Sequence, residues 1–155
     1  MIPEDGTIAL VEDNEDDLFF MKRALQSAGI ANPLQVLATG TTAIQYLTGS
    51  GAYTDRSRYP LPFLLLLDLK LPDMSGFEVL RWIRGDEGMH NLAVIVLTTS
   101  GASKDIDRAY ELRANSFLVK PSGSDRLLDL VIALKQYWFI HNGYPKAFPY
   151  ARNRG

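Results

Sequence analysis

The stretch FLLLLD at residues 63–68 decides the fold of this chain. Leucine favours helices, but Pro60, Pro62 and Pro72 bracket the apolar run too closely to leave room for a helix. A continuous apolar run is typical of a central strand in a parallel sheet, which is covered on both faces. We therefore predict a buried strand over residues 63–67 that ends at Asp68.

Four further strands are predicted, two before this run and two after it. Their apolar residues lie at 7–11, 34–37, 93–97 and 116–119. The first predicted helix runs from the acidic residues before Leu18 to Gly29. Four further helices are predicted over 42–47, 76–84, 103–113 with Ser103 as N-cap, and about 127–138. Residues 48–62 are polar and rich in Gly, Ser and Pro, so we expect a long loop there.

The alternation of strands and helices predicts an α/β domain with a five-stranded parallel sheet and helices on both faces. In such sheets, ligands bind beyond the carboxyl ends of the strands. The polar residues at those ends are Glu12, Asp13, Asp68, Thr98 and Lys120. Four strands are therefore expected to bring polar side chains to one crevice.

Three of these residues are carboxylates, which repel each other in a confined crevice unless a proton or a cation intervenes. Magnesium suits such a site, because it prefers oxygen ligands and is usually held by one or two carboxylates together with phosphate oxygens. A carboxylate can also attack phosphorus to form an aspartyl phosphate, and Asp68 is best placed to do so. Thr98 and Lys120 would then stabilise charge on the transferred group.

The composition narrows the classes of function. A chain of 155 residues suits one domain, and we expect a lead over 1–6, the domain over 7–139 and an aromatic and basic tail over 140–155. The net charge of -2 gives no basic surplus for nucleic acid, and the lack of cysteine excludes disulfides and thiolate chemistry. We see no secretory leader and no bilayer-spanning run, so we expect a cytoplasmic protein without a membrane partner.

Four motifs lie at the predicted strand ends, namely VEDN at 11–14, LDLKLPDMSG at 67–76, TTS at 98–100 and KP at 120–121. The chain resembles the receiver domain of bacterial two-component response regulators in these four motifs. Their order and intervals both match the family, and the resemblance covers roughly Thr7 to Trp138. It implies a flavodoxin-like doubly wound sheet with strand order 2-1-3-4-5, and a phosphorelay in which a histidine kinase phosphorylates this protein.

The resemblance also implies a role for individual residues. Asp68 is expected to be the phosphoacceptor, with Thr98 and Lys120 in contact with the phosphoryl group. Phe117 matches the switch aromatic, which in relatives moves inward as the hydroxyl residue closes on the phosphate. Magnesium would be bound by Asp13, Asp68 and the backbone carbonyl of Lys70, with Glu12 acting indirectly.

Further features are similar to the small stand-alone receivers that are paired with bacterial phytochromes. These features are the long loop before the third strand, the run at 97–100 and the aromatic tail. They imply a light-regulated histidine kinase as phosphodonor, a homodimer, and a separate downstream protein as target. Two residues depart from the family pattern. Lys70 replaces the common Asn and is expected to alter the phosphoryl lifetime, and Thr99 is bulkier than the usual residue and would narrow the access of water.

Two other functions fit the same topology. A phosphatase or phosphotransferase would use Asp68 as nucleophile toward small substrates, but it would need an extra acid or base, and Lys70 stands where one such superfamily has a second aspartate. A flavin electron carrier would need a hydroxyl- and glycine-rich phosphate loop after the first strand, where this chain has Glu12, Asp13 and Asn14. We therefore expect a phosphoacceptor that catalyses only its own phosphorylation and dephosphorylation.

We assign no role in this chemistry to two further groups of residues. The acidic residues Glu15, Asp16 and Asp17 are expected to favour a helix N-terminus and to stay solvated. The aromatic residues near the C-terminus are expected to contribute to an interface; they are Tyr137, Trp138, Phe139, Tyr144, Phe148 and Tyr150.

Overall fold

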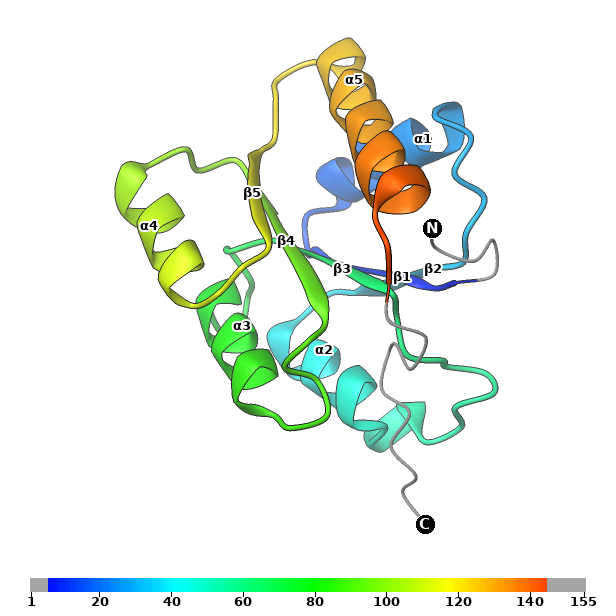
Figure 1. Cartoon of the computed structure of the whole chain (residues 1–155), viewed down its shortest axis with the longest axis vertical. Helices are drawn as coiled ribbons and strands as arrows, with labels where there is room; N and C mark the ends of the chain where they lie inside the picture. The colour runs from blue at the N-terminus through cyan, green and yellow to red at the C-terminus, as the bar shows by residue number, and fades with distance from the viewer. Residues whose placement is uncertain (1–5, 145–155) are drawn as a thin grey trace.

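The computed structural model describes residues 6–144 of the 155-residue chain, and strands and helices alternate along it (Figure 1). The strands are β1 (Ile8–Val11), β2 (Leu34–Leu37), β3 (Leu64–Leu67), β4 (Ala93–Thr98) and β5 (Ser116–Val119). The α-helices are α1 (Glu15–Ser27), α2 (Gly40–Thr48), α3 (Gly76–Gly85), α4 (Ser103–Glu111) and α5 (Ser124–Leu134). A short 3-10 helix, η1 (Gly51–Tyr53), follows α2, and a π-helical segment, η2 (Lys135–His141), continues α5.

The five strands form one parallel sheet in the order β2-β1-β3-β4-β5, which confirms the predicted fold class and strand order. The central strand β3 is the apolar run of the sequence, and all of its residues are buried. In the register of the sheet, Val11 lies opposite both Leu37 and Leu67, and Leu67 lies opposite Val96. The strands therefore end along one edge, and the residues that follow them are brought together.

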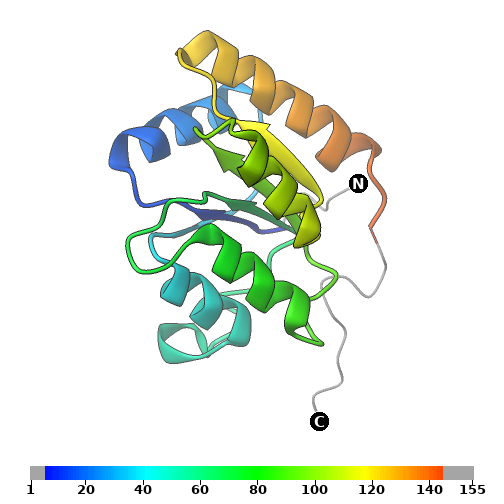
Figure 2. The same cartoon turned by 90° about the vertical axis from the view of Figure 1, so that its left-hand side faces the viewer.

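Two apolar cores lie on opposite faces of the sheet. Because side chains alternate along a strand, Leu65 and Leu67 of β3 belong to one core, and Leu64 and Leu66 belong to the other. Helices α2, α3 and α4 cover the first face, and α1 and α5 cover the second (Figure 2). None of the helices within residues 6–144 combines the length and the apolar character that crossing a membrane requires.

Capping side chains begin α1, α2 and α3. Asn14 is the N-cap of α1, and Ser75 begins α3 in a capping box with Glu78. The prediction that Ser103 caps the next helix is wrong by one residue. Ala102 already has the extended backbone of an N-cap, so Ser103 becomes the first helical residue of α4 and no side chain caps this helix.

The predicted loop over 48–62 is held against the C-terminal end of α2. The Arg56 guanidinium donates hydrogen bonds to the backbone oxygens of Tyr46 at 2.7 Å, Leu47 at 2.9 Å and Tyr59 at 3.2 Å. Carbonyl groups in the last turn of a helix have no partner within that helix, so this arginine supplies one. The loop also contains η1, which the sequence did not predict.

The last helix extends further than predicted, because α5 passes directly into η2, which ends at His141. The chain then returns at Tyr144, whose hydroxyl donates to the Trp138 carbonyl at 2.9 Å and whose ring meets Phe63 edge-on. Part of the predicted aromatic tail therefore packs on the domain. Phe148 and Tyr150 lie outside the described residues.

Candidate functional site

Backbone hydrogen bonds extend one residue beyond the ends of three strands. The amide of Glu12 donates to Leu37 at 3.0 Å, and the amide of Asp68 donates to Val11 at 3.1 Å. The amide of Lys120 donates to Thr98 at 2.7 Å. These bonds fix where the polar side chains leave the sheet, and all of them lie at the carboxyl edge, as predicted.

The Asp68 carboxylate is held by three donors. Its Oδ1 accepts the Thr98 hydroxyl at 3.0 Å and the Lys70 amide at 3.2 Å, and its Oδ2 accepts Lys120 Nζ at 2.9 Å. Thr98 is fully buried, and the Asp68 side chain is only 10% exposed. A carboxylate fixed in this way can present one oxygen to a reacting group without first being ordered.

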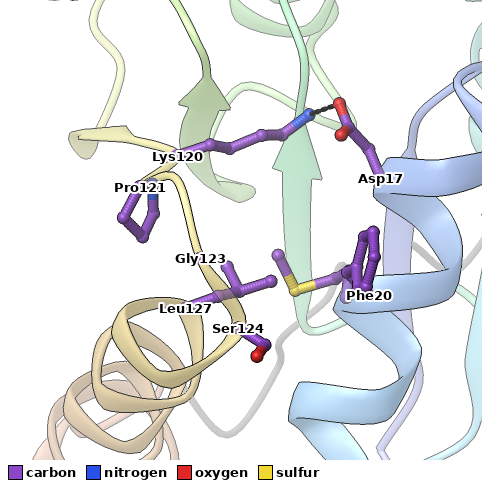
Figure 3. Close-up of a pocket in the computed structure, with 8 residues that line it drawn as sticks. Asp17, Phe20, Lys120, Pro121, Gly123, Ser124 and Leu127 are labelled. Atoms are coloured by element: carbon purple, nitrogen blue, oxygen red, sulfur yellow. Dashed lines mark hydrogen bonds and ion pairs between the residues drawn. The ribbon is translucent and has the colours of Figure 1, made fainter.

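Lys120 lies at the centre of the acidic residues. Its ammonium group donates to Glu12 Oε1, to Asp17 Oδ2 at 3.1 Å and to Asp68 Oδ2 at 2.9 Å. Figure 3 shows Lys120 reaching across from the end of β5 to Asp17 at the start of α1. A lysine ammonium has three N–H donors, so each of them has a carboxylate partner here.

Two neighbouring carboxyl groups have shifted pKa values in opposite directions. Burial, followed by the adjacent Asp68 carboxylate, raises the pKa of Glu12 to about 7, although Lys120 acts against this. Burial would also raise the pKa of Asp68, but the adjacent Glu12, the hydrogen bond from Lys120 and the lysine charge outweigh burial and lower it. Burial alone would lower the pKa of Lys120, yet its bonds to these carboxylates raise it. Asp68 is therefore ionised at neutral pH.

The arrangement suits a hard cation. Oxygens from Glu12, Asp17 and Asp68 all lie within 4.8 Å of one another. Glu12 Oε2 is buried and has no hydrogen-bond partner among the described residues. A buried carboxylate oxygen without a donor, beside two further carboxylates, fits a divalent cation that takes oxygen ligands.

Glycine at position 76 allows the backbone to pass close to Asp68. A Cβ atom at this position would lie 2.2 Å from the Asp68 carbonyl oxygen and 2.8 Å from Leu69 Cα. Both are backbone atoms, so they cannot move aside as a flexible side chain could. The glycine of the LPDMSG motif therefore lets α3 begin directly against the residue that carries the carboxylate.

The structure brings together four of the predicted site residues, namely Glu12, Asp68, Thr98 and Lys120. The exposed side chain of Asp13 is not part of the group of carboxylates around Lys120. Lys70 contributes its backbone amide to the site, while its residue is exposed. Phe117 is half-buried on β5 and packs against the core beneath α2, α3 and α4.

Asp17 is the residue that the sequence interpretation missed. It was expected to be one of several solvated acids in the first turn of α1, yet it contacts Lys120 from a segment 103 residues away. Acidic residues at a helix N-terminus are so common that their presence gave no signal of this contact. Only the packing of α1 beside the loop after β5 distinguishes Asp17 from Asp16.

A small pocket lies beside this contact, between the start of α1 and the segment that joins β5 to α5 (Figure 3). Its volume is about 130 Å³. The pocket is lined by Asp17, Phe20, Met21, Lys120, Pro121, Gly123, Ser124 and Leu127. Asp17 and Lys120 therefore form the polar end of an otherwise largely apolar recess.

Comparison with known proteins places this geometry in a family. Residues 8–132 match the model of the response regulator receiver domain. The probable methanogenesis regulatory protein FilR2 of Methanothrix harundinacea is 38% identical over 141 residues, which cover 89% of this chain and 86% of that protein. Response regulator Rcp1 of Synechocystis sp. is 34% identical over 131 residues, which cover 84% of this chain and 87% of Rcp1.

Solved structures give the same result. The crystal structure of the phosphorylated cyanobacterial phytochrome response regulator RcpA has a TM-score of 0.84 and 31% identity, and the match covers 90% of this chain and 98% of RcpA. The Mn(2+)-bound form of response regulator Rcp1 has a TM-score of 0.81 and 33% identity, with 90% of this chain and 99% of Rcp1 covered. The sheet order, the polar residues at its carboxyl edge and the family match agree, and the chain therefore belongs to the response regulator receiver domain family.

Proposed function

We propose that this protein accepts a phosphoryl group on Asp68 from a histidine kinase and passes the signal to a partner protein. The observation that carries the proposal is the placement of the Asp68 carboxylate, which is held at 3.0 Å by the Thr98 hydroxyl and at 2.9 Å by Lys120 Nζ. An ionised carboxylate is a nucleophile toward phosphorus, and the two partners supply a hydroxyl and a positive charge where negative charge develops.

The proposed transfer conserves the atoms and charges of both partners. A carboxylate oxygen of Asp68 forms a bond to the phosphorus of the phosphodonor, and the bond between phosphorus and the donor's leaving atom breaks. The leaving group departs with the electron pair, and the product is an aspartyl phosphate on Asp68. Lys120 and Thr98 neutralise charge on the phosphoryl oxygens, because phosphoryl transfer requires mainly positioning and electrostatic stabilisation.

We also propose that the resident cation is Mg²⁺, bound by Asp13, Asp68 and the Lys70 carbonyl, with Glu12 acting indirectly. The carboxylate cluster and the partnerless Glu12 Oε2 support a divalent cation in this crevice. Bound there, the cation would offset the repulsion among the carboxylates and the anionic phosphoryl group. The Mn(2+)-bound relative supports a metal of this class.

The proposed switch uses Thr98 and Phe117. Thr98 ends β4, and Phe117 lies on the neighbouring strand β5, opposite Val96. A phosphoryl group on Asp68 would compete for the Thr98 hydroxyl, and movement of Thr98 would change the packing beside Phe117. Phosphorylation can shift the protein toward an active surface only if the phosphoryl group interacts differently with the two states.

The proposal extends to partners and place of action. The phytochrome response regulator RcpA among the relatives supports a light-regulated kinase as phosphodonor. We further propose a downstream protein as target, a homodimer, a cytoplasmic location, and no turnover of external phosphate esters.

We also predict that the lifetime of the phosphoryl group changes in Lys70→Asn. The rate at which the phosphoryl group is lost from each chain measures this change.

The first test is intact mass after incubation with acetyl phosphate and Mg²⁺. The chain should gain one phosphoryl group, and the gain should vanish in Asp68→Asn and when EDTA removes the metal. Asp16→Asn is the matched control, because it removes the same charge from an exposed residue and should be phosphorylated normally. A gain that persists in Asp68→Asn, or no gain in the unaltered chain, would contradict the proposal.

A further inference from the structure

Asp17 approaches Lys120 from α1, a different element from those that carry the other site residues. Its Oδ2 accepts a hydrogen bond from Lys120 Nζ at 3.1 Å, and its side chain is 37% exposed. The other two partners of the ammonium are much more deeply buried, with Glu12 at 3% and Asp68 at 10% exposure. Among the three described partners of Lys120, Asp17 is therefore the one that faces water.

Lys120 has only three N–H donors, so it can bind a further partner only if it releases one of its present partners. Its three N–H groups already serve three carboxylates. A phosphoryl group on Asp68 would add anionic oxygens that need the same ammonium, so at least one present bond has to be given up. Release of Asp17 is the least unfavourable exchange, because its carboxylate can be hydrated, whereas Glu12 would be left buried and without its cation.

Asp17 also opposes the arrival of the phosphodonor. One of its carboxylate oxygens lies within 4.8 Å of carboxylate oxygens of Asp68 and Glu12. A phosphodonor is itself an anion, so this third carboxylate at the entrance adds like-charge repulsion. Because Asp17 is partly exposed, salt should screen this repulsion more effectively than it screens the buried groups.

We propose that Asp17 is a positioning residue that holds Lys120 in the unphosphorylated protein and is exchanged for the phosphoryl group, which slows phosphorylation of Asp68. This inference rests on the proposed function. The residue need not touch the reacting atoms, since it acts through the ammonium group and through its charge. Removal of its charge should therefore make the site react faster, which is the opposite of what loss of a catalytic group does.

The competing role for Asp17 is that of a ligand to the cation, because it belongs to the same group of carboxylates. The two roles predict opposite results for one variant. If Asp17 holds Lys120, Asp17→Asn reacts faster and binds Mg²⁺ as before. If Asp17 binds the metal, the same variant binds Mg²⁺ more weakly and reacts more slowly at limiting Mg²⁺.

The test compares the full chain with Asp17→Asn, Asp17→Glu and Asp16→Asn. The rate of phosphorylation by acetyl phosphate is measured by intact mass at saturating Mg²⁺ in low and in high salt, and Mg²⁺ affinity is measured by calorimetry. Asp17→Asn should react about two- to fivefold faster in low salt, which is the range of a partly exposed ion pair. The faster rate of Asp17→Asn should approach that of the unaltered chain in high salt. The dissociation constant for Mg²⁺ should differ by less than about twofold between the two chains.

The two other variants separate the contact from general charge effects. Asp17→Glu keeps the carboxylate and should stay slow, and Asp16→Asn should accelerate phosphorylation less than Asp17→Asn does. An Asp17→Asn rate equal to or below that of the unaltered chain or of Asp16→Asn, or weakened Mg²⁺ binding, would overturn the inference. If no chain gains a phosphoryl group at all, the proposed function fails, and the inference fails with it.

Discussion

Glu12 and Asp68 directly follow two neighbouring strands, yet their surroundings shift their pKa values in opposite directions. Glu12 is buried and faces the negative charge of Asp68, and its pKa is raised to about 7. Asp68 receives the Thr98 hydroxyl, the Lys70 amide and Lys120, and its pKa is lowered despite burial. Two interacting carboxyl groups with divergent pKa values titrate in separate steps, so Asp68 stays ionised for reaction while Glu12 takes up a proton as the pH falls below about 7.

The first prediction concerns the pH dependence of stability in the metal-free protein. The pKa of Glu12 is raised from 4.5 to about 7 on folding, so its contribution is fully present below pH 4.5 and is lost as the pH rises through 7. The free energy of unfolding in EDTA should therefore fall between pH 5 and pH 8, on the order of 1 to 3 kcal/mol. Urea unfolding at several pH values measures this slope.

Glu12→Gln is the control for this prediction, because glutamine keeps the shape and cannot titrate. The variant should lose most of the decline between pH 5 and pH 8. Parallel pH profiles for the variant and the unaltered chain would show that another group causes the dependence.

At the scale of elements, the loop between β3 and α3 is tied to the start of α2. Asp73 Oδ1 accepts the Gly40 amide at 2.8 Å, and Asp73 Oδ2 accepts the amide of Thr41 at 2.8 Å and its hydroxyl at 2.5 Å. The first amide groups of a helix have no partner within that helix, so a carboxylate from another segment can cap it. The loop that begins at Asp68 is thereby fixed against a neighbouring helix.

The second prediction follows from this cap. Asp73→Ala should lower the free energy of unfolding by about 1 to 2 kcal/mol, as expected for loss of a helix cap. Thr41→Val removes only the hydroxyl bond and should cost less. Urea unfolding at neutral pH measures both losses, and equal stability of Asp73→Ala and the unaltered chain would exclude this role.

The same cap should respond to acid. Hydrogen bonding, first from the Thr41 side chain and then from the two amides, lowers the pKa of Asp73 from 3.8 to about 2. The stability that Asp73 contributes is therefore present above pH 3.8 and is lost as the pH falls toward 2. The difference in stability between the unaltered chain and Asp73→Ala should narrow over this window.

A third prediction concerns Arg56, which joins the loop over 49–62 to the end of α2. Arg56→Ala should destabilise the protein by about 2 to 3 kcal/mol, because three carbonyl groups lose a charged donor. Arg56→Lys should lose nearly as much, since a single ammonium cannot reproduce a planar guanidinium that reaches all three. Chemical unfolding measures both.

Arg58→Ala is the matched control for this loop. Arg58 lies over the ring of Tyr59 at 5.4 Å, and its removal should cost no more than about 1 kcal/mol. If Arg56→Ala cost no more than Arg58→Ala, general loss of charge would explain the effect, and the bonds to α2 would not.

At the scale of the whole molecule, the sequence predicted the features that follow from the parallel topology of the sheet. Strands that run the same way must end at the same edge, so Asp68, Thr98 and Lys120 could be placed together from their positions after apolar runs. Side-chain direction at the end of β1 was harder to foresee. Glu12 turns into the protein and Asp13 turns out to solvent, as alternation along an extended chain requires.

The features that sequence could not supply depend on how elements pack. Asp17 contacts Lys120 because α1 lies beside the segment after β5, and no local pattern distinguishes it from its acidic neighbours. The start of α4 differed by one residue because Ala102 adopts the N-cap conformation without a capping side chain. Tertiary packing thus selects Asp17 among locally equivalent acids, whereas at α4 the residue with the weaker capping preference takes the N-cap position.

The last prediction joins the site to the stability of the whole fold. Asp13 follows β1, and Asp68 and Lys70 follow β3, so these proposed ligands come together only when the two strands pair in the sheet. A divalent cation that needs them should therefore bind the folded chain and not the unfolded chain. At free Mg²⁺ about one hundred times the dissociation constant, binding should add about 2.7 kcal/mol. For a chain of this size, that corresponds to a rise in Tm of about 5 to 10 °C. Asp68→Asn should lose most of this rise while Asp16→Asn keeps it, as measured by thermal unfolding with Mg²⁺ and with EDTA. An equal rise in both variants would place the metal away from Asp68, and the cation would then have no part in phosphorylation.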